Sequence, residues 1–199
     1  MNSSDSNGVS YNIFQDWKAN SGNVNSQVIM ISYRIAKWAR NKTILTILFF
    51  WYLILYKIFI EWISGIQISL FAKIGKDFRI ENGRGTFIDD EAEFGINCTL
   101  RQLSVVGRKK LIDNTFSGVP KIGDNVDIGV SAIIIGNIQI GNNVTIGAGA
   151  VITKNVSDNS VMVGNPAKLL KKVYDFPAIE DSEKKIDEND ESVSLLDRV

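Results

Sequence analysis

The chain of 199 residues contains no histidine at all. It therefore lacks the side chain that proteins use most often for proton transfer near neutral pH and for metal binding. A single cysteine, Cys98, excludes an internal disulfide and fits a reducing compartment. Basic and acidic residues balance at 22 each without a dense basic stripe, so nothing indicates a nucleic-acid partner.

The N-terminal segment, residues 1–20, is polar and rich in serine and asparagine. It has no basic and then apolar pattern of the kind that marks a secretory signal peptide. We therefore predict a cytoplasmic protein, with a peripheral place at the inner face of the membrane as the alternative.

A six-residue repeat runs from Ile122 to about Val156. An isoleucine opens each of six units, and a small or β-branched residue fills the fifth position. A strict period of six matches neither an amphipathic helix nor an ordinary strand, and it is the signature of a parallel β-helix. Each unit is expected to form a short strand and a corner, and glycine after the isoleucine and Asn or Asp mid-unit suit corners with positive φ. The first positions are Ile122, Ile128, Ile134, Ile140, Ile146 and Ile152, and the fifth are Val126, Ala132, Ile138, Val144, Ala150 and Val156.

The six-residue repeat extends upstream of Ile122, and there its register shifts by two residues between Thr86 and Ile88. The β-helix is therefore predicted over residues 72–157. A polar segment with Gly and Pro, residues 108–121, interrupts the beat and is predicted to leave the coil as a loop, either functional or merely solvated. The upstream positions are Ile74, Ile80, Thr86, Ile88, Phe94, Leu100 and Val106.

Residues 21–71 are predicted to be helical. An apolar stripe at spacings of four and three begins this region, and basic residues fall on the other side. The stripe either packs on the rest of the protein or lies on a membrane surface as part of a basic amphipathic helix. The stripe is Val24, Val28, Ile31, Ile35 and Trp38, and the basic residues are Arg34, Lys37 and Arg40.

An uncharged stretch follows from Thr43 to Tyr56. Its fourteen residues fall short of the roughly 20 that a transmembrane helix needs, and a span over residues 44–63 would have to carry Lys57 and Glu61. We predict a buried or interfacial helix, keep a transmembrane span as the alternative, and expect any peripheral membrane contact within residues 24–63.

The C-terminal part divides into a cap and a tail. In the cap, residues 158–175, the GNPAK stretch from Gly164 to Lys168 is predicted to close the last coil and lead into a short helix. The tail, residues 176–199, is acidic and almost free of large apolar residues, so it is predicted to be disordered.

These motifs resemble the hexapeptide-repeat acyltransferases, and within them the serine acetyltransferase-like branch that includes relatives associated with capsule and polysaccharide synthesis. The resemblance implies a mainly β fold, a left-handed parallel β-helix with N-terminal α-helices. It also implies a homotrimer or a multiple of trimers, with active sites in the clefts between neighbouring subunits. The co-substrate it implies is acetyl-CoA. The stretches that carry the resemblance are QDWKAN, EWISGIQIS, AKIGKDFRI, INCTLRQ, KIGDNVDIG, IIIGNIQIGNNVTIGAGAVITKNV and VMVGNPAK.

The resemblance places acetyl-CoA near the later turns of the β-helix. Small residues let a thin pantetheine arm approach the backbone, and lysine answers phosphate charge. For each glycine the alternative is a plain coil corner, and for each lysine a solvated surface position. The residues implied are Gly147, Ala148, Thr153, Lys154, Gly164 and Lys168.

The chain departs from the family at the general base. The family's acid and histidine fall on Glu81 and Asn82, the loop histidine falls on Val119, and a further histidine falls near Asp90. Loss of a positioned base typically costs about 10²–10⁴-fold in rate.

A carboxylate could act instead, and the candidates are Glu81, Asp89 and Asp90. Burial or a neighbouring carboxylate would have to raise its pKa, and the IDDEAE segment, residues 88–93, makes this conceivable. The alternative is that these acids decorate a solvated face. Cys98 fits a small core residue better than a nucleophile, and no cluster of residues suggests a metal site.

Two functions therefore stand side by side. The first is an acetyl-CoA-dependent O-acetyltransferase, acting on a small-molecule hydroxyl acceptor, either serine or a sugar or polysaccharide precursor. The second is a non-catalytic trimeric β-helix that binds acyl-CoA or a partner without turnover.

Overall fold

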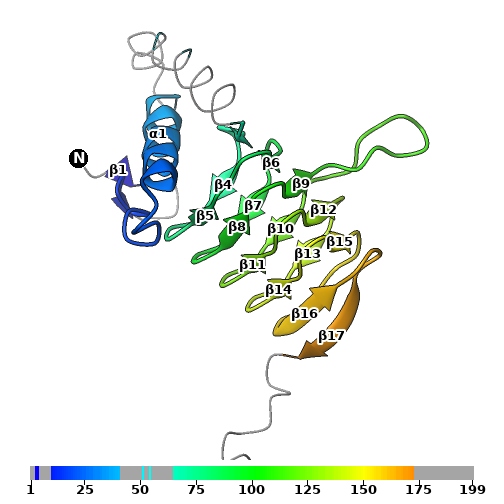
Figure 1. Cartoon of the computed structure of the whole chain (residues 1–199). Helices are drawn as coiled ribbons and strands as arrows, with labels where there is room; N and C mark the ends of the chain where they lie inside the picture. Colours follow the sequence, from blue (N-terminus) through cyan, green and yellow to red (C-terminus); the bar gives the residue numbers. More distant parts are fainter. Residues whose placement is uncertain (1–2, 5–9, 41–50, 52–53, 55–64, 173–199) are drawn as a thin grey trace, which may run out of the picture.

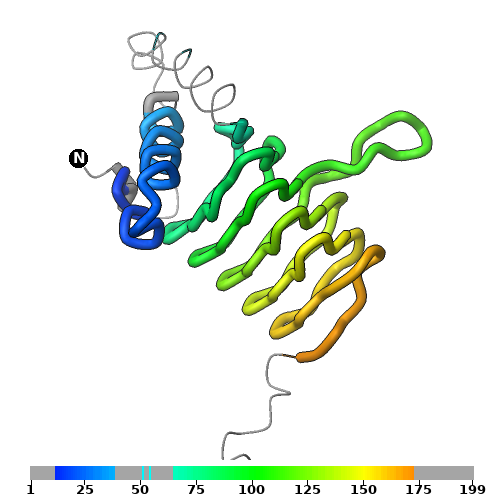
Figure 2. The backbone as a smooth tube through the Cα atoms, viewed as in Figure 1, coloured from blue at the N-terminus to red at the C-terminus, as the bar shows by residue number. Residues whose placement is uncertain are grey.

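The structure is a computed structural model that describes residues 3–4, 10–40, 51, 54 and 65–172. A helical N-terminal part sits at one end of a coil of short strands, and a hairpin closes the other end (Figures 1 and 2). The N-terminal part consists of β1 (Ser3–Ser4), β2 (Ser10–Tyr11) and the helix α1 (Val24–Arg40).

Three sheets form the sides of the coil, and each full turn gives one strand to each sheet. We call them the β3, β4 and β5 sheets after their first strands. The β3 sheet contains β3 (Gln67–Ile68), β6 (Phe87–Ile88), β9 (Val105–Gly107), β12 (Ile133–Ile135) and β15 (Val151–Ile152). The β4 sheet contains β4 (Lys73–Ile74), β7 (Glu93–Phe94), β10 (Lys121–Ile122) and β13 (Gln139–Ile140). The β5 sheet contains β5 (Arg79–Glu81), β8 (Thr99–Arg101), β11 (Asp127–Ile128), β14 (Thr145–Ile146), β16 (Ser160–Val163) and β17 (Lys168–Lys172).

The repeat positions build the core as predicted. Ile122 pairs in register with Ile140, and Ile128 pairs with Ile146, so identical side chains stack from turn to turn. All first and fifth positions of the six units are buried, and so are the seven upstream positions. The parallel β-helix is therefore confirmed, and it begins with β3, five residues before the predicted start at residue 72.

The corners use asparagine and glycine in a way that differs from the prediction. Asn125 and Asn143 adopt positive φ values of 56° and 54°, as expected for mid-unit positions. The glycine after the isoleucine has another role, because a Cβ at Gly129 would lie 2.6 Å from the backbone nitrogen of Ala148. Such glycines are therefore required for the close approach of successive turns, and not for positive φ.

The predicted packing face of α1 is wrong. Val24 is 71% exposed and Val28 is 52% exposed, whereas Arg34, predicted on the opposite side, is 1% exposed. The reason is that α1 covers the open end of the coil, where backbone carbonyls have no preceding turn to pair with. Polar side chains of α1, including Ser26 and Tyr33, supply those hydrogen bonds, so a mixed face packs inwards.

The segment after GNPAK is also different from the prediction. A short helix was expected there, but β17 forms an antiparallel pair with β16. The hairpin covers the last edge of the β5 sheet, because an extended strand satisfies that edge and a helix cannot.

Most of the apolar stretch, residues 44–63, and the acidic tail lie outside the described residues, so the predictions for them stay predictions. No helix among the described residues is long and apolar enough to cross a membrane.

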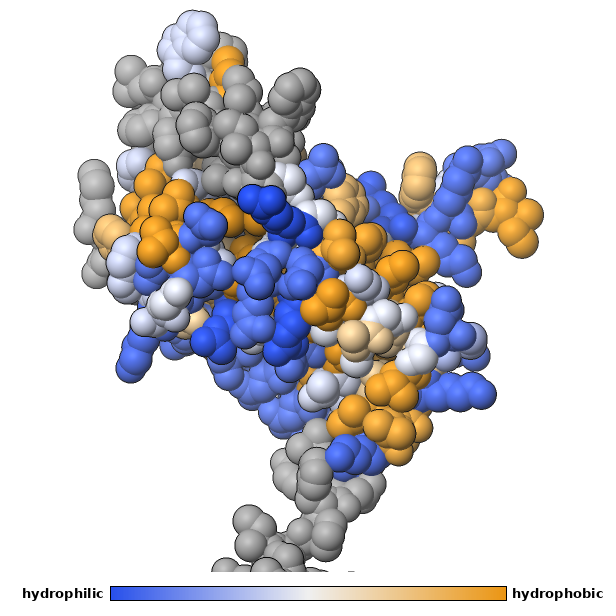
Figure 3. All heavy atoms as spheres, viewed as in Figure 1, coloured by the Kyte–Doolittle hydropathy of each residue, from blue (hydrophilic) through white to orange (hydrophobic). Residues whose placement is uncertain are grey.

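The outer faces of the three sheets differ in polarity. The β4 and β5 sheets turn charged and hydroxyl side chains outwards, such as Lys121 and Asp127. The β3 sheet turns out Phe87, Val105 and Ile133. Figure 3 shows hydrophobic side chains gathered near the base of the arm formed by residues 108–120, and hydrophilic ones over the neighbouring face. One side of the coil is therefore apolar over several turns.

Candidate functional site

The corner between β5 and β6 is larger than the corners below it. Arg79 of β5 pairs with Thr99, twenty residues on, whereas Asp127 of β11 pairs with Thr145, eighteen residues on. The first turn thus holds two extra residues, which explains the shift in the six-residue beat. Asn82 enters this corner with a φ of 52°. We call residues 81–85 the expanded corner.

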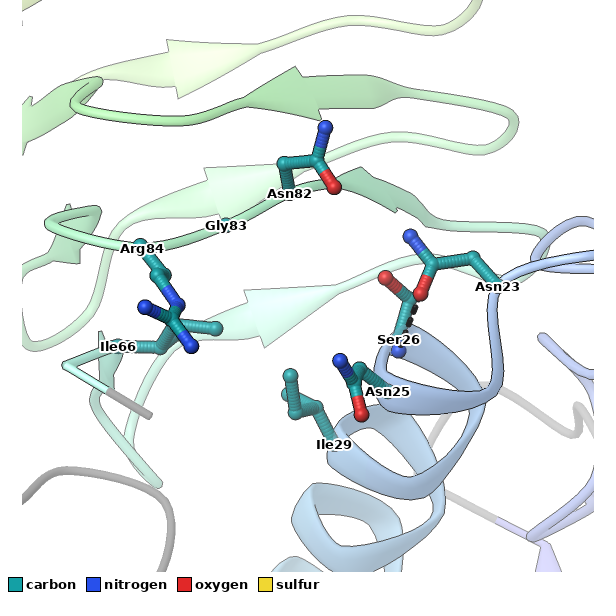
Figure 4. A pocket seen from close by; sticks show the side chains of 8 residues that line it. All are labelled: Asn23, Asn25, Ser26, Ile29, Ile66, Asn82, Gly83 and Arg84. Carbon is teal, nitrogen blue, oxygen red and sulfur yellow. Dashed lines mark hydrogen bonds between the residues drawn. The ribbon is translucent and has the colours of Figure 1, made fainter. Parts of the chain in front are cut away.

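A cavity of about 370 Å³ lies between the expanded corner and the start of α1. Figure 4 shows Arg84 and Ile66 on one side of it, and residues of the helix start on the other. A volume of this size fits a small-molecule site, for which a few hundred Å³ is usual. The lining residues are Asn23, Asn25, Ser26, Ile29, Ile66, Asn82, Gly83 and Arg84.

The start of α1 is fixed beside the cavity by local hydrogen bonds. The Asn23 side chain caps the helix, because its Oδ1 accepts from the Ser26 backbone nitrogen at 3.2 Å. Ser26 Oγ in turn donates to the carbonyl of Ile80 at 2.6 Å. The start of α1 and strand β5 are therefore held together beside the cavity.

Glu81, the first candidate base, is turned to the outer face of the β5 sheet. Its Oε2 lies 2.9 Å from Arg101 Nε, and its Oε1 lies 3.7 Å from Arg79 Nη1. Partial burial lowers the pKa of Arg101. The hydrogen bond and charge of Asp127, together with those of Glu81, raise this pKa by more than burial lowers it, so the guanidinium stays charged. Glu81 thus faces two arginines, Arg79 and Arg101, and it shares Arg101 with the carboxylate of Asp127.

Asp90, the second candidate, lies in another setting. Its Oδ1 accepts a hydrogen bond from Ser69 Oγ, and Arg108 Nη2 lies 3.9 Å from its Oδ2. Asp89 accepts from the Arg108 backbone nitrogen at 3.0 Å. These groups meet at the edge between the β3 and β4 sheets, at the base of the arm.

The acidic IDDEAE segment gathers Asp89 and Asp90 around Arg108, but it directs Glu93 elsewhere. Glu93 points from the β4 sheet and bonds Lys73 Nζ at 2.7 Å. That hydrogen bond lowers the pKa of Glu93, against a smaller opposing effect of burial. A carboxylate base needs a raised pKa, so this lowered pKa opposes such a role for Glu93.

The candidate catalytic residues lie at two separate edges. Glu81 and Asn82 precede β6, whereas Asp90 follows it. Val119 ends the arm just before β10, on the same edge as Asp90. The arm projects from the coil (Figure 1), and its two sides are linked by an isolated antiparallel bridge between Lys110 and Phe116. Within one chain the structure therefore does not bring Glu81 and Asn82 together with the residues of the other edge, Asp90 and Val119.

The predicted donor residues lie on the last two turns. The Gly147 backbone nitrogen donates to the Met162 carbonyl at 2.8 Å, and the Val151 nitrogen donates to the Gly164 carbonyl at 3.0 Å. Gly147, Ala148 and Gly164 thus share the edge between the β5 and β3 sheets.

The other three predicted donor residues are solvent-exposed. Lys168 begins β17 opposite Val163, whereas Thr153 and Lys154 follow β15 on the edge between the β3 and β4 sheets. All three side chains are open to a ligand. A second, open hollow of about 630 Å³ lies over the β4 sheet, and none of the six predicted residues lines it.

Cys98 belongs to the core. It is fully buried, its Sγ lies 3.2 Å from the Gly123 carbonyl, and burial raises the pKa of its thiol to about 11. These properties oppose a role as a nucleophile. Among the described residues, no group of three or more Cys, Asp or Glu side chains could hold a metal ion.

Apart from Asn82, the residues around the cavity were not found from the sequence. Asn25 and Arg84 carry no motif of their own, and only the two-residue shift of the repeat at the expanded corner marks this place. A shift in an otherwise strict repeat was the signal that could have revealed it.

Comparison with known proteins indicates the family and the fold. Residues 120–154 match the model of the bacterial transferase hexapeptide family (six repeats). The chain is 34% identical over 163 residues to the putative colanic acid biosynthesis acetyltransferase WcaB of Escherichia coli K12, covering 79% of this chain and 98% of that protein. It is 37% identical over 111 residues to a serine acetyltransferase of Staphylococcus aureus N315, covering 54% of this chain and 50% of the relative.

Solved structures share the fold. The serine acetyltransferase of Neisseria gonorrhoeae superposes with a TM-score of 0.65 at 25% identity, over 84% of this chain and 67% of that one. The corresponding enzyme of Brucella abortus gives a TM-score of 0.66 at 22% identity, over 80% and 67% of the two chains. The predicted left-handed parallel β-helix with an N-terminal helical part is thereby confirmed.

Proposed function

This chain belongs to the bacterial hexapeptide-repeat transferase family, as an O-acetyltransferase, and we propose that it uses acetyl-CoA to acetylate a hydroxyl of serine or of a sugar or polysaccharide precursor. The observation that carries the proposal is the match to a colanic acid acetyltransferase over 98% of that protein's length. The matched relatives are acetyltransferases of a polysaccharide pathway or of serine.

The donor half of the proposed site is the end of the coil. Gly147 and Ala148 have at most a methyl group at the edge between the β5 and β3 sheets, where the Val163 side chain of the next turn also lies, and we propose that a pantetheine arm runs along this edge. Lys154 and Lys168 are exposed and can reach phosphate groups. A solved serine acetyltransferase in complex with CoA shares this fold at a TM-score of 0.58.

The reaction needs a group that takes the acceptor's proton. The acceptor oxygen attacks the thioester carbonyl, the carbon–sulfur bond breaks, and CoA leaves as the thiol with the proton that the base removed. Without histidine, we propose that a carboxylate takes this role. Asp90 suits this role better than Glu81, because its partner Ser69 is neutral and Arg108 is more distant, whereas Glu81 bonds an arginine directly.

We further propose that the chain acts as a homotrimer. The apolar outer face of the β3 sheet lies between the two edges that hold the candidate residues, and burying it against another copy stabilises the assembly. Such packing allows the arm of one copy, with Val119, to approach the Glu81 edge of the next. A complete site then requires two copies.

A second candidate function rests on the missing histidines. Asn82 and Val119 occupy the positions where the resemblance places histidines. Neither side chain can accept a proton usefully. A trimeric β-helix with an intact donor half and no base would bind acyl-CoA without turnover.

A thiol-release assay separates the two functions. The purified protein receives acetyl-CoA together with L-serine, sugars or nucleotide sugars, and we expect at least one acceptor to raise thiol release above buffer. If no acceptor does so while acetyl-CoA still binds, the non-catalytic function holds. Where turnover is found, Asp90→Asn and Glu81→Gln identify the base, with Glu91→Gln, an exposed carboxylate at a corner, as the matched control.

A further inference from the structure

Several polar side chains around the cavity keep their hydrogen-bonding capacity. Among the described residues, the side-chain amides of Asn25 and Asn82 and the guanidinium of Arg84 make no hydrogen bond or ion pair. Asn23 uses its oxygen to cap α1, which leaves its NH₂ group available. Two amides with both donors and acceptors, a further NH₂ group and one cation therefore converge on a single hollow.

Among the described residues that line the cavity, Arg84 carries a positive charge and none carries a negative one. Glu81 is next to Asn82 in the chain, but its carboxylate is held on the outer face by Arg101 at 2.9 Å. A free amino acid such as serine can present its carboxylate to Arg84, but none of the described lining residues offers a carboxylate to its ammonium group, which is unfavourable.

The cavity also offers a small apolar surface. Ile29 and Ile66 are buried and form part of its wall. A pyranose ring has C–H groups that can contact such a surface, while its hydroxyls meet the amides. An anionic substituent on the ring would satisfy Arg84 through two parallel hydrogen bonds.

We infer that this cavity binds the hydroxyl acceptor, and that the acceptor is a saccharide with an anionic group, a uronate or a sugar phosphate. The inference rests on the proposed function for the identification of the ligand as acceptor. The amides select the polyol, and Arg84 selects the negative charge. Serine is thereby disfavoured as the natural acceptor.

Binding without acetyl-CoA tests the inference independently of turnover. Glucuronate, glucose 1-phosphate, glucose and L-serine are titrated into the full-length protein by calorimetry. We expect at least one anionic sugar to bind about 10- to 100-fold more tightly than glucose, as a hydrogen-bonded charge pair commonly gives. The uronate and phosphate arms distinguish the two sources of negative charge.

Variants assign the preference to the cavity. Arg84→Gln should reduce the affinity for the anionic sugar to that for glucose, whereas Arg84→Lys keeps the charge, loses the two-point geometry and should fall between. Lys76→Gln removes an exposed cation between β4 and β5, away from the cavity, and should change nothing.

Three results overturn the inference: L-serine binding as tightly as the anionic sugars, an anionic preference that survives Arg84→Gln, or no saccharide binding at millimolar concentration. Failure of the proposed function looks different, since saccharides would then bind normally while thiol release stays at the buffer level.

Discussion

Arg34 and Asp16 form a buried two-point ion pair at the open end of the coil. Arg34 Nε lies 2.8 Å from Oδ2 of Asp16, Nη2 lies 3.2 Å from Oδ1, and the side chains are 1% and 2% exposed. Arg34 also donates to the carbonyls of Ile74 and Gly75, and Asp16 accepts from the Phe78 backbone nitrogen. The pair therefore replaces the strand edge that a preceding turn would supply.

Asp16→Ala should lower the free energy of unfolding by about 3–5 kcal/mol, because it leaves a guanidinium buried without its partner. Urea denaturation followed by circular dichroism measures the change. The control is Glu93→Ala, which breaks the more exposed pair with Lys73 and should cost less than about 1 kcal/mol. Equal losses in the two variants would show that the buried pair has no special role.

The sequence predicted the core well because each position of the repeat is either buried or exposed in every turn. Ile122 and its successors recur every six residues because each points inwards at the same place in every turn. The face of α1 was mispredicted because apolar spacing assumes that packing follows hydrophobicity. At the end of a coil, unpaired carbonyls such as that of Ala72 need hydrogen-bond donors, and Tyr33 and Lys37 supply them.

Asn143→Ala should destabilise the coil by about 2–3 kcal/mol. Asn143 links Asn125 and Asn159 through side-chain hydrogen bonds of 3.0 and 2.9 Å, and its φ of 54° is unfavourable for alanine. Asn143→Gly loses the same hydrogen bonds but accepts this φ, so its loss should be about 1 kcal/mol smaller. Thermal and urea denaturation compare the two, and equal losses would contradict the role given to the backbone.

Cys98 should make the protein less stable in alkali. Burial raises the pKa of its thiol to about 11, whereas an unfolded cysteine titrates near about 8.5. As the pH rises through this interval the unfolded chain releases its proton first, so the free energy of unfolding falls. The difference between wild type and Cys98→Ala should therefore change between pH 8 and 10 and stay constant between pH 6 and 7.5. A constant difference throughout would exclude the buried thiol as the cause.

The site was harder to predict than the core, because chain order does not show which edge of the coil a residue occupies. Glu81 and Asp90 are nine residues apart, yet a strand separates them and each has different partners. Arg84 was missed because its importance depends on the helix that faces it across the cavity. Such juxtapositions arise from packing between distant segments, and a repeat pattern contains no information about them.

Asn82→His should raise the rate of acetyl transfer. Asn82 lines the cavity, its side chain makes no hydrogen bond among the described residues, and it occupies the position where the family resemblance expects a histidine. Its φ of 52° lies in a region that histidine tolerates better than most residues. A positioned imidazole typically contributes about 10²–10⁴-fold, and the rate should acquire a dependence on a group that titrates near about pH 6.5.

Asn97→His is the matched control for that gain. Asn97 also has a positive φ, 56°, but lies between β7 and β8, at an edge that holds none of the candidate residues. Thiol release with the best acceptor, measured from pH 5.5 to 8.5, compares the two variants with wild type. A new pH dependence confined to Asn82→His would place residue 82 beside the reacting hydroxyl. If both variants keep the wild-type rate and profile while acetyl-CoA binds, the expanded corner does not hold the base, and Asp90 at the other edge becomes the remaining candidate.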